Sequence, residues 1–549
     1  MLLLAPVYAA QIVNVEYIHN AIAQKWDITV PYNSALSDPR VAANMKYLLT
    51  TIDVANEMLN GESTTEYGNG EYATLVAADT IATNNAVEQL IKQSIVYPFT
   101  ATTAIDTTEF KFRISSAGEF YIDWGDGSTE VVTKTDASTQ ELSHNYDTAG
   151  MYKIKLAGKA TGYNSTDLWG AISFSSETDL VAIDGCLGCI FSTLSDNTQP
   201  RFRATFSGTS ITSIPEGLFA GLHGEFTSGM FELAFAGTKI TSIPANLFHN
   251  LVMSSYGASG VFSSAFEDTP ITSIPENLFA KVTYAGTRMF DSTFSGTQIR
   301  EIPAGLFSSL RGARGYAPFV ATFADTPITS IPENLFAGIE MGAYSTFSLT
   351  FAGTKITSIP SKLFANITWN DEYPEETFAS TFAGTKITSI PEGLFNSFLQ
   401  NDYYMAPWVF SGTFDNCERL ERLPDNLFAG LRWAGLVDGV AYIFAGTFSN
   451  CTSLKEIPYN LFGADVMYNF AEGDEWMYEG AFAGTFAGCS SLTGPSARIK
   501  GEYFYEKWPT VPPEIFYDMY FGCEGLSDYN CIPSEWGGGG KNCLWTDPA

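Results

Sequence analysis

The chain has 549 residues, of which 45% are hydrophobic and 14% are aromatic. This composition supports a large buried core and excludes a chain that is mostly disordered. The 60 Asp and Glu residues outnumber the 29 Lys and Arg residues, which gives a formal net charge of −31. A surface this negative repels nucleic acid and anionic membranes, so we expect neither as a partner.

The first ten residues, MLLLAPVYAA, resemble the end of a secretion signal. An apolar run at Leu2–Ala5 precedes Val7 and Ala9, which stand three residues and one residue before an expected cleavage point. No Lys or Arg precedes this short run, so the alternatives are a start further upstream and a buried first strand. No later segment approaches the roughly 18 apolar residues of a membrane span. We therefore expect a secreted or cell-surface protein with no direct membrane span.

Residues 11–100 contain two helical patterns. Apolar side chains recur at helical spacing between Val41 and Leu59, and Gly61 closes that segment. Residues 82–96 form a second helix candidate. Together they predict a small helical domain of unknown type. It either attaches the protein to an envelope partner, mediates self-association, or serves as a cap.

Residues 101–162 alternate between apolar and polar side chains, which predicts strands. Two of the segments read FYIDWGDGSTEVV and HNYDTAGMYKIKLAG. They resemble the PKD-type immunoglobulin-like domain, a small β-sandwich that acts mostly as a spacer on secreted proteins. The residues that carry the resemblance are Trp124–Ser128, His144, Tyr146, Gly150 and Tyr152.

Two carboxylates of this segment, Asp123 and Asp126, are candidates for binding calcium, which would be the one cofactor of the protein. The favoured interpretation is a tight hairpin turn, because Gly and Asp tolerate the backbone angles that such a turn requires.

From residue 201 to residue 526 the sequence repeats. The words AFAGTKITSIPANLF, TFAGTKITSIPSKLF and TFAGTKITSIPEGLF end at Phe248, Phe364 and Phe395. The proline of each Ile-Pro or Leu-Pro pair recurs after 28 to 34 residues, and a Phe precedes it by nine or ten. Such a period indicates a solenoid, in which no repeat can cover its own apolar face and stacked repeats share one core.

Within each repeat the pattern assigns positions. Ile387 and Ile390, or Leu420 and Leu423, are expected to point into the core from a short strand that pairs with the strands of neighbouring repeats. Pro391 cannot donate a ladder hydrogen bond and should end that strand. Leu394 and Phe395 should turn back inward on a short helical turn.

The later repeats, FDNCERLERLP and FSNCTSLKEIP, resemble the leucine-rich repeats of bacterial surface proteins of the BspA-like, Treponema-type class. The resemblance extends over about residues 179–526. The earlier repeats depart from it, with Thr in place of Cys and one residue fewer before the Ile. It implies a mainly β fold with short helices: a leucine-rich-repeat solenoid of about ten coils, preceded by the β-sandwich and the helical domain. Residues 163–200 would form an N-terminal cap with a degenerate first repeat, and residues 527–549 a C-terminal cap.

The eight cysteines fall into three groups. Cys531 and Cys543 bracket a Gly-rich loop and are a candidate disulfide. A redox or zinc role for Cys186 and Cys189 has weak support, because no second Cys or His pair stands near. The remaining four recur once per repeat, where the earlier repeats have Thr, and are expected to be small buried residues. Disulfides between repeats or a string of metal sites are the alternatives. These four are Cys417, Cys451, Cys489 and Cys523.

The segments between repeats vary, and several are aromatic and acidic: residues 365–377, 399–410 and 464–480. Solenoids display such insertions along one face, and exposed Tyr and Trp offer a large contact area at low entropic cost. The alternative is that each ring packs on the flank of its own repeat. The candidate ligand-binding residues are Trp369, Tyr403, Tyr404, Trp408, Tyr468, Trp476 and Tyr478.

No catalytic set is visible. The four histidines are scattered, and the chain lacks G-x-S-x-G, H-E-x-x-H and P-loop motifs. We therefore expect an adhesin-like protein that binds an extracellular protein or glycan. The alternatives are a structural subunit of an extracellular filament or coat that assembles through its N-terminal domain and, third, an enzyme displayed on a solenoid.

Overall fold

The computed structural model describes residues 97–549 apart from short internal gaps and the C-terminal end. The gaps are 165–168, 254, 256, 370–373, 400–405, 431–440, 464–478, 500, 509–512 and 542–549. The chain divides between Tyr97 and Pro98 into two compact units, and all the described strands and helices belong to the second. The predicted signal remnant and nearly all of the predicted helical domain lie outside the described residues.

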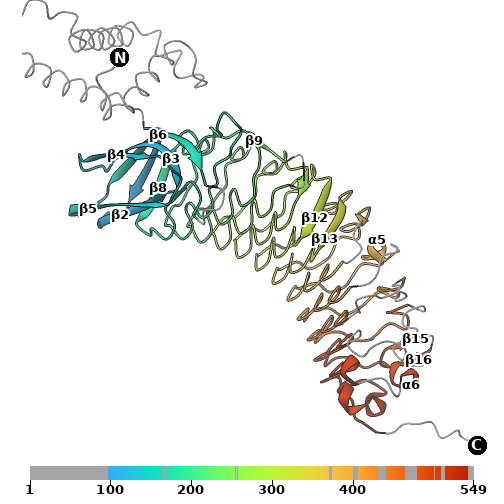
Figure 1. The fold of residues 1–549 in the computed structure, drawn as a ribbon. Helices are drawn as coiled ribbons and strands as arrows, with labels where there is room; N and C mark the ends of the chain where they lie inside the picture. The colour runs from blue at the N-terminus through green and yellow to red at the C-terminus, as the bar shows by residue number, and fades with distance from the viewer. Residues whose placement is uncertain are drawn as a thin grey trace, which may run out of the picture. The chain divides into compact units, whose positions relative to one another are not determined.

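The described fold is mainly β with a few short helices (Figure 1). Its N-terminal part consists of two antiparallel sheets. The larger sheet has the order β4 (Thr129–Lys134), β3 (Ser116–Asp123), β6 (Lys153–Tyr163), β1 (Phe99–Thr103), β8 (Leu180–Gly185). The smaller has the order β5 (Gln140–Gly150), β2 (Thr107–Ile114), β7 (Ile172–Ser173).

The two sheets pack face to face through residues that alternate along their strands. Phe110 and Phe112 of β2 are buried, whereas Lys111 between them is exposed, as a strand with one covered face requires. The Phe112 ring lies 5.8 Å from the ring of Trp124, which follows β3 in the other sheet. Aromatic side chains therefore fill the space between the layers.

Both sheets are completed by residues that the sequence pattern had placed in a cap and a degenerate first repeat. β8 pairs with β1, and β7 pairs with β2. The first turns of the repeats then continue from these strands, since Phe174 donates a backbone hydrogen bond to Thr205 (2.7 Å). Residues 163–200 thus belong to the sheets as much as to the repeats, because β1 and β2 would otherwise be open edges.

Each repeat contains a bend segment, which in the repeat of Phe323 comprises residues 317–326. Every fourth residue there has a left-handed backbone, with φ of 56° at Ala317, 49° at Ala321 and 56° at Asp325. Alternate backbone N–H groups of the bend segment donate hydrogen bonds to carbonyls of the next repeat. The N–H groups of Ala321, Phe323 and Asp325 donate, in that order, to the carbonyls of residues 348, 350 and 352 at 2.8–3.0 Å. The bend segments are therefore stacked in chain order, as Figure 1 shows.

The two apolar side chains of each Ile-Thr-Ser-Ile segment are buried as expected, but the segments do not form the predicted strands. Ile387 and Ile390 are buried, as are Leu420 and Leu423. The only β pairing of these segments in the described part of the chain is an isolated bridge between Ser389 and Arg422. Neighbouring segments are joined instead by isolated backbone hydrogen bonds, such as the one from the Lys386 N–H to the Ile356 carbonyl (3.0 Å).

Strands occur instead in the segments that join the repeats. Four of them form a parallel sheet, and two others pair in parallel. The strands are β11 (Tyr284–Ala285), β12 (Gly312–Tyr316), β13 (Glu340–Tyr344), β14 (Thr368–Trp369), β9 (Gly224–Glu225) and β10 (Leu251–Val252). A short antiparallel pair follows later: β15 (Arg498–Ile499) and β16 (Glu502–Tyr503).

The short helices lie in the C-terminal half. α5 follows directly on Phe395, where the chain was expected to turn inward. At the end of the stack, the Tyr520 N–H donates to the Trp536 carbonyl (2.8 Å), so the final helical turn occupies the place of a further repeat. The helices are α5 (Asn396–Leu399), α6 (Phe504–Lys507), η3 (Pro513–Phe516), η4 (Tyr529–Cys531) and η5 (Ser534–Trp536).

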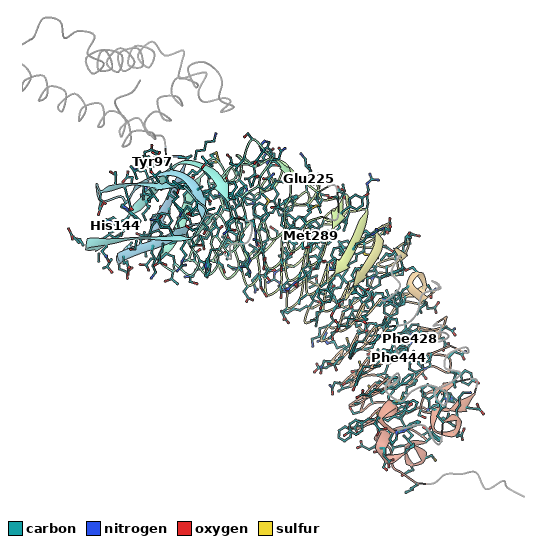
Figure 2. All side chains as sticks on the ribbon, in the orientation of Figure 1. Tyr97, His144, Glu225, Met289, Phe428 and Phe444 are labelled. Carbon is teal, nitrogen blue, oxygen red and sulfur yellow. A yellow bond between two sulfur atoms is a disulfide. The ribbon has the colours of Figure 1, made fainter. Side chains whose placement is uncertain are left out.

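Phenylalanine rings stack from repeat to repeat through the core. The Phe that precedes each proline by nine or ten residues lies on the same Phe of the next repeat, as Phe294 does on Phe323 at 5.9 Å. This stack begins within the sheets, where Phe174 contacts both Phe112 (5.2 Å) and Phe206 (5.6 Å). A second stack, four residues earlier in each repeat, includes Phe444, which also contacts Phe428 at 4.8 Å (Figure 2). One core thus continues from the sheets into the repeats.

Candidate functional site

Trp369 is buried in the core and is not a ligand contact, contrary to the prediction. Its exposed fraction is 5%, and its ring meets Phe398 edge-on at 4.9 Å. It also lies 5.9 Å from Phe378 and points its Nε1 at the Ser397 hydroxyl, 3.5 Å away. Burial against its own and the neighbouring repeat removes the contact area that a partner would need.

Trp408 is exposed and forms a second kind of aromatic contact. Its exposed fraction is 39%, and its ring is parallel to that of Tyr442 in the next repeat, with centroids 5.8 Å apart. The two residues occupy equivalent places on adjacent bend segments, both with left-handed backbone. One more repeat along, Gly480 occupies the same place, and a side chain there would collide with the Tyr442 ring.

An acidic side chain joins this pair. Glu479 Oε1 accepts a hydrogen bond of 2.8 Å from the Tyr442 hydroxyl, which raises the pKa of that tyrosine. We call Trp408, Tyr442 and Glu479 the aromatic ladder. It combines a flat apolar surface with a carboxylate and a phenol, groups that can bind a sugar ring or an apolar side chain flanked by hydrogen-bond donors. Tyr442 is not among the residues predicted from the sequence, because it stands in a repeat and not in an insertion between repeats.

The other five predicted aromatic residues lie outside the described residues: Tyr403, Tyr404, Tyr468, Trp476 and Tyr478.

The candidate calcium carboxylates belong to a hairpin turn. Asp123 accepts a hydrogen bond from the Gly125 N–H (3.0 Å) and forms an ion pair with Lys155 (2.8 Å). Asp126 accepts hydrogen bonds from the Ser128 hydroxyl and N–H, and lies 2.7 Å from His144 Nε2. The Ser128 hydroxyl, together with His144, holds the pKa of Asp126 at about 2. These contacts from Asp123 and Asp126 to the backbone of Gly125 and Ser128 are those of a tight turn, as the favoured interpretation expects.

The sequence-motif residues around this turn lie together. The Tyr146 hydroxyl donates to the Trp124 carbonyl (2.9 Å), His144 stacks on Trp124 at 5.0 Å, and Tyr152 stacks on Tyr146. All of these contacts join residues of the same two-sheet part of the chain to one another. We therefore assign His144 a structural role in packing the hairpin.

The four cysteines that recur in the late repeats are buried and free. Each thiol points at the carbonyl of the Phe that leads the preceding repeat, as Cys417 does at Phe382 (3.2 Å) and Cys451 at Phe414 (3.2 Å). Burial raises the pKa of Cys417 and of Cys523 to about 12, and that of Cys451 well above its usual value. This agrees with small buried residues rather than with disulfides between repeats.

We predict that these thiols lower stability at alkaline pH. In the unfolded chain they lose their protons near a pH of about 8.5, whereas in the folded chain they stay protonated. The free energy of unfolding should therefore fall above that pH, by up to about 1.4 kcal/mol per pH unit for each thiol. Urea unfolding at several pH values measures this. A variant with Thr at all four positions, the residue of the early repeats, should lose this part of the decline, and an unchanged decline would contradict it.

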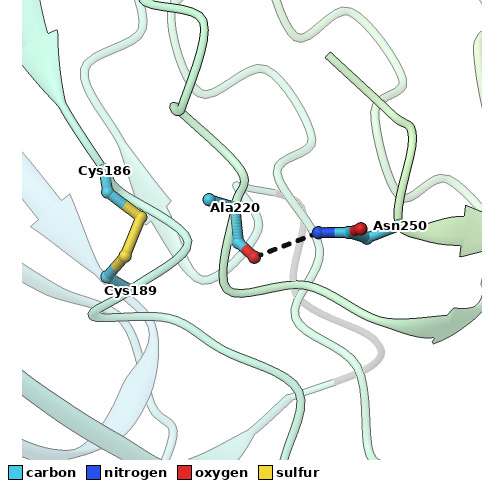
Figure 3. The surroundings of a disulfide bond; sticks show 4 residues. All are labelled: Cys186, Cys189, Ala220 and Asn250. Atoms are coloured by element: carbon cyan, nitrogen blue, oxygen red, sulfur yellow. Dashed lines mark hydrogen bonds between the residues drawn. A yellow bond between two sulfur atoms is a disulfide. The ribbon is translucent and has the colours of Figure 1, made fainter. Parts of the chain in front are cut away.

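The other cysteines lie at the two ends of the repeats. Cys186 and Cys189 form a disulfide in the loop after β8, close to the hydrogen bond from Asn250 Nδ2 to the Ala220 carbonyl (Figure 3). Their sulfurs are therefore not available to zinc in this state. Cys531 is disulfide-bonded, and Cys543, its predicted partner, lies outside the described residues.

Across the described ranges, no group of three His, Cys, Asp or Glu side chains is placed to hold a metal ion. In the same ranges no helix has the length and apolar character needed to cross a membrane. No protein-family model and no curated protein matches the chain.

Proposed function

We propose that this chain is an adhesin-like binding protein, secreted or displayed on a bacterial cell surface. In this proposal a leucine-rich-repeat solenoid of the BspA-like type is the scaffold, and a PKD-like sandwich joins it to the N-terminal domain. Aromatic side chains on the flank of the later repeats bind an extracellular protein or glycan. No catalytic step is part of the proposal.

The observation that carries the proposal is the aromatic ladder. The stacked rings of Trp408 and Tyr442 are held on two consecutive repeats, so their relative position is fixed before a partner binds. Such pre-organisation lowers the entropic cost of binding, and large exposed aromatic rings supply much of the energy of protein interfaces. The uniform repeats behind them support a role as scaffold.

The test is binding of the full chain to arrays of extracellular-matrix proteins and glycans. The Trp408→Ala variant is expected to weaken saturable binding by about 30-fold, which corresponds to a hot-spot loss of about 2 kcal/mol. Its circular dichroism should be unchanged, because the ring is exposed. Phe521→Ala, which removes another exposed aromatic ring that belongs to neither proposed binding surface, is the matched control and should bind normally. Saturable binding that Trp408→Ala leaves intact would contradict the proposed surface.

A further inference from the structure

A cavity of about 340 Å³ lies beside β2, where the smaller sheet meets the first turns of the repeats. Its volume is at the low end of the range for small-molecule sites, about 300–1,000 Å³. Three separate stretches of chain line it: β2, β5, and the segment that runs from Trp169 through β7 to Glu177. None of the residues proposed above as contacts for a partner belongs to it.

One wall of the cavity is an aromatic ring held by a cation. Trp169 is 38% exposed, and the Arg113 guanidinium lies over its ring, 5.1 Å from the centroid. Arg113 Nη2 also forms an ion pair with Glu141 Oε2 at 2.6 Å. Because the guanidinium is planar and held from two sides, it restricts both Trp169 and Glu141.

The floor of the cavity is apolar with hydroxyl groups at its edge. Phe112 and Phe174 are buried there and stack on each other at 5.2 Å. Ser173 is also buried, and its hydroxyl accepts a hydrogen bond from the Ser175 N–H (3.1 Å). The next residue, Ser176, has a left-handed backbone with φ of 64°, held by its N–H bond to the Ser207 carbonyl (2.7 Å).

The charged side chains that line the cavity sum to no net charge. Lys111 and Arg113 provide two positive charges, and Glu141 and Glu177 provide two negative ones. The Glu177 side chain is half-buried, and this burial raises the pKa of its carboxyl. A lining with no net charge that is rich in both donors and acceptors suits a neutral ligand with many hydroxyl groups better than it suits an ion.

We propose that this cavity binds a saccharide of one or two rings. The sugar's apolar face packs on the exposed part of the Trp169 indole, and its hydroxyls exchange hydrogen bonds with Arg113, Glu141 and Glu177. An aromatic ring offers a flat apolar surface to the C–H groups of a pyranose. Ionised side chains form stronger hydrogen bonds than neutral ones. These bonds can therefore replace the hydrogen bonds to water that a sugar hydroxyl loses on binding. The inference does not rest on the proposed adhesin function, because the aromatic ladder is a separate surface.

The experiment is saturation-transfer NMR of the full chain with a panel of free neutral hexoses, N-acetylhexosamines, uronic acids and disaccharides made from them. We expect at least one neutral sugar to give a saturable signal. Trp169→Ala should weaken its binding by about tenfold or more. Trp169→Phe, which keeps a ring for the sugar to stack on, should retain most of the affinity. Phe521→Ala, which removes an exposed ring outside both this cavity and the aromatic ladder, should have no effect.

Three results would overturn the proposal. The first is that no sugar of the panel gives a saturable signal. The second is that Trp169→Ala binds as well as the unaltered chain while remaining folded. The third is that only the charged uronic acids bind, and that Glu177→Gln strengthens this binding, which would identify an anion site. Chemical shifts of the sugar are recorded in the same experiment. If these shifts showed that a disaccharide is cleaved, the cavity would be a catalytic site and not only a binding site. Glu141 and Glu177 would then be the candidate catalytic residues.

Discussion

Replacing Phe174 with alanine is expected to lower the free energy of unfolding by about 3–5 kcal/mol, the range for a fully buried Phe. The side chain is buried, and its ring contacts Phe99, Phe110, Phe112 and Phe206 at 5.2–6.3 Å. These contacts join the two sheets to the first repeat. We therefore also expect the calorimetric transition of the Phe174→Ala variant to split into two, one for the sheets and one for the repeats.

Phe521→Ala is the matched control for this substitution, since the same atoms are removed from a ring that is 63% exposed. It should change the free energy of unfolding by less than about 0.5 kcal/mol. Urea unfolding of both variants, followed by Trp fluorescence, provides the comparison. Equal losses in the two variants would mean that Phe174 does not connect the sheets to the repeats.

The second large effect is expected for Gly185→Ala, at the end of β8. Gly185 has a φ of 86°, and a Cβ there would lie 2.0 Å from the Pro98 carbonyl oxygen. A left-handed backbone costs an alanine about 1–2 kcal/mol, and the collision adds about 1–3 kcal/mol. The variant should therefore lose about 2–5 kcal/mol of stability. The Cys186 N–H bond to the same carbonyl (2.6 Å) should be lost with it.

Two other glycines separate the two causes. Gly127 has a φ of 93° but no atom within 4 Å of a Cβ, so Gly127→Ala reports the backbone cost alone. Gly217 has the same open space without the left-handed backbone, and Gly217→Ala should be close to neutral. In thermal unfolding, Gly185→Ala should lose the most stability of the three variants, Gly127→Ala less, and Gly217→Ala the least. If Gly185→Ala lost no more stability than Gly127→Ala, β8 would be able to move away from Pro98. That result would contradict the close pairing of β8 with β1.

The repeat period predicted the core well. Ile387, Ile390, Leu420 and Leu423 are buried as expected, because a fixed spacing returns the same side chain to the same place. The strands were placed wrongly, in the Ile-Thr-Ser-Ile segments. The alternation there predicts correctly that the Ile side chains face the core, but strand pairing also needs successive backbone groups of neighbouring repeats to meet, which a pattern within one repeat does not specify.

The candidate sites show a similar limit. Trp369 and Trp408 both stand in aromatic insertions, yet one is buried and the other is exposed. The sequence does contain an indication that Trp369 is buried. Ile367 and Trp369 are two residues apart and alternate with the exposed Thr368, as in a strand with one covered face. The cavity beside β2 had no such signal. Arg113, Glu141 and Trp169 are brought together by the pairing of β2 with β5 and β7, which no local pattern specifies.

In the proposed function, the repeats form a scaffold on which a single chain binds its partner. Size-exclusion chromatography with light scattering, run over a range of concentrations on the chain used for the binding arrays, tests it most directly. We expect the mass of one chain at every concentration, together with saturable binding that depends on Trp408. Growth into large particles with rising concentration, and no ligand on the arrays, would contradict it and identify a structural subunit instead.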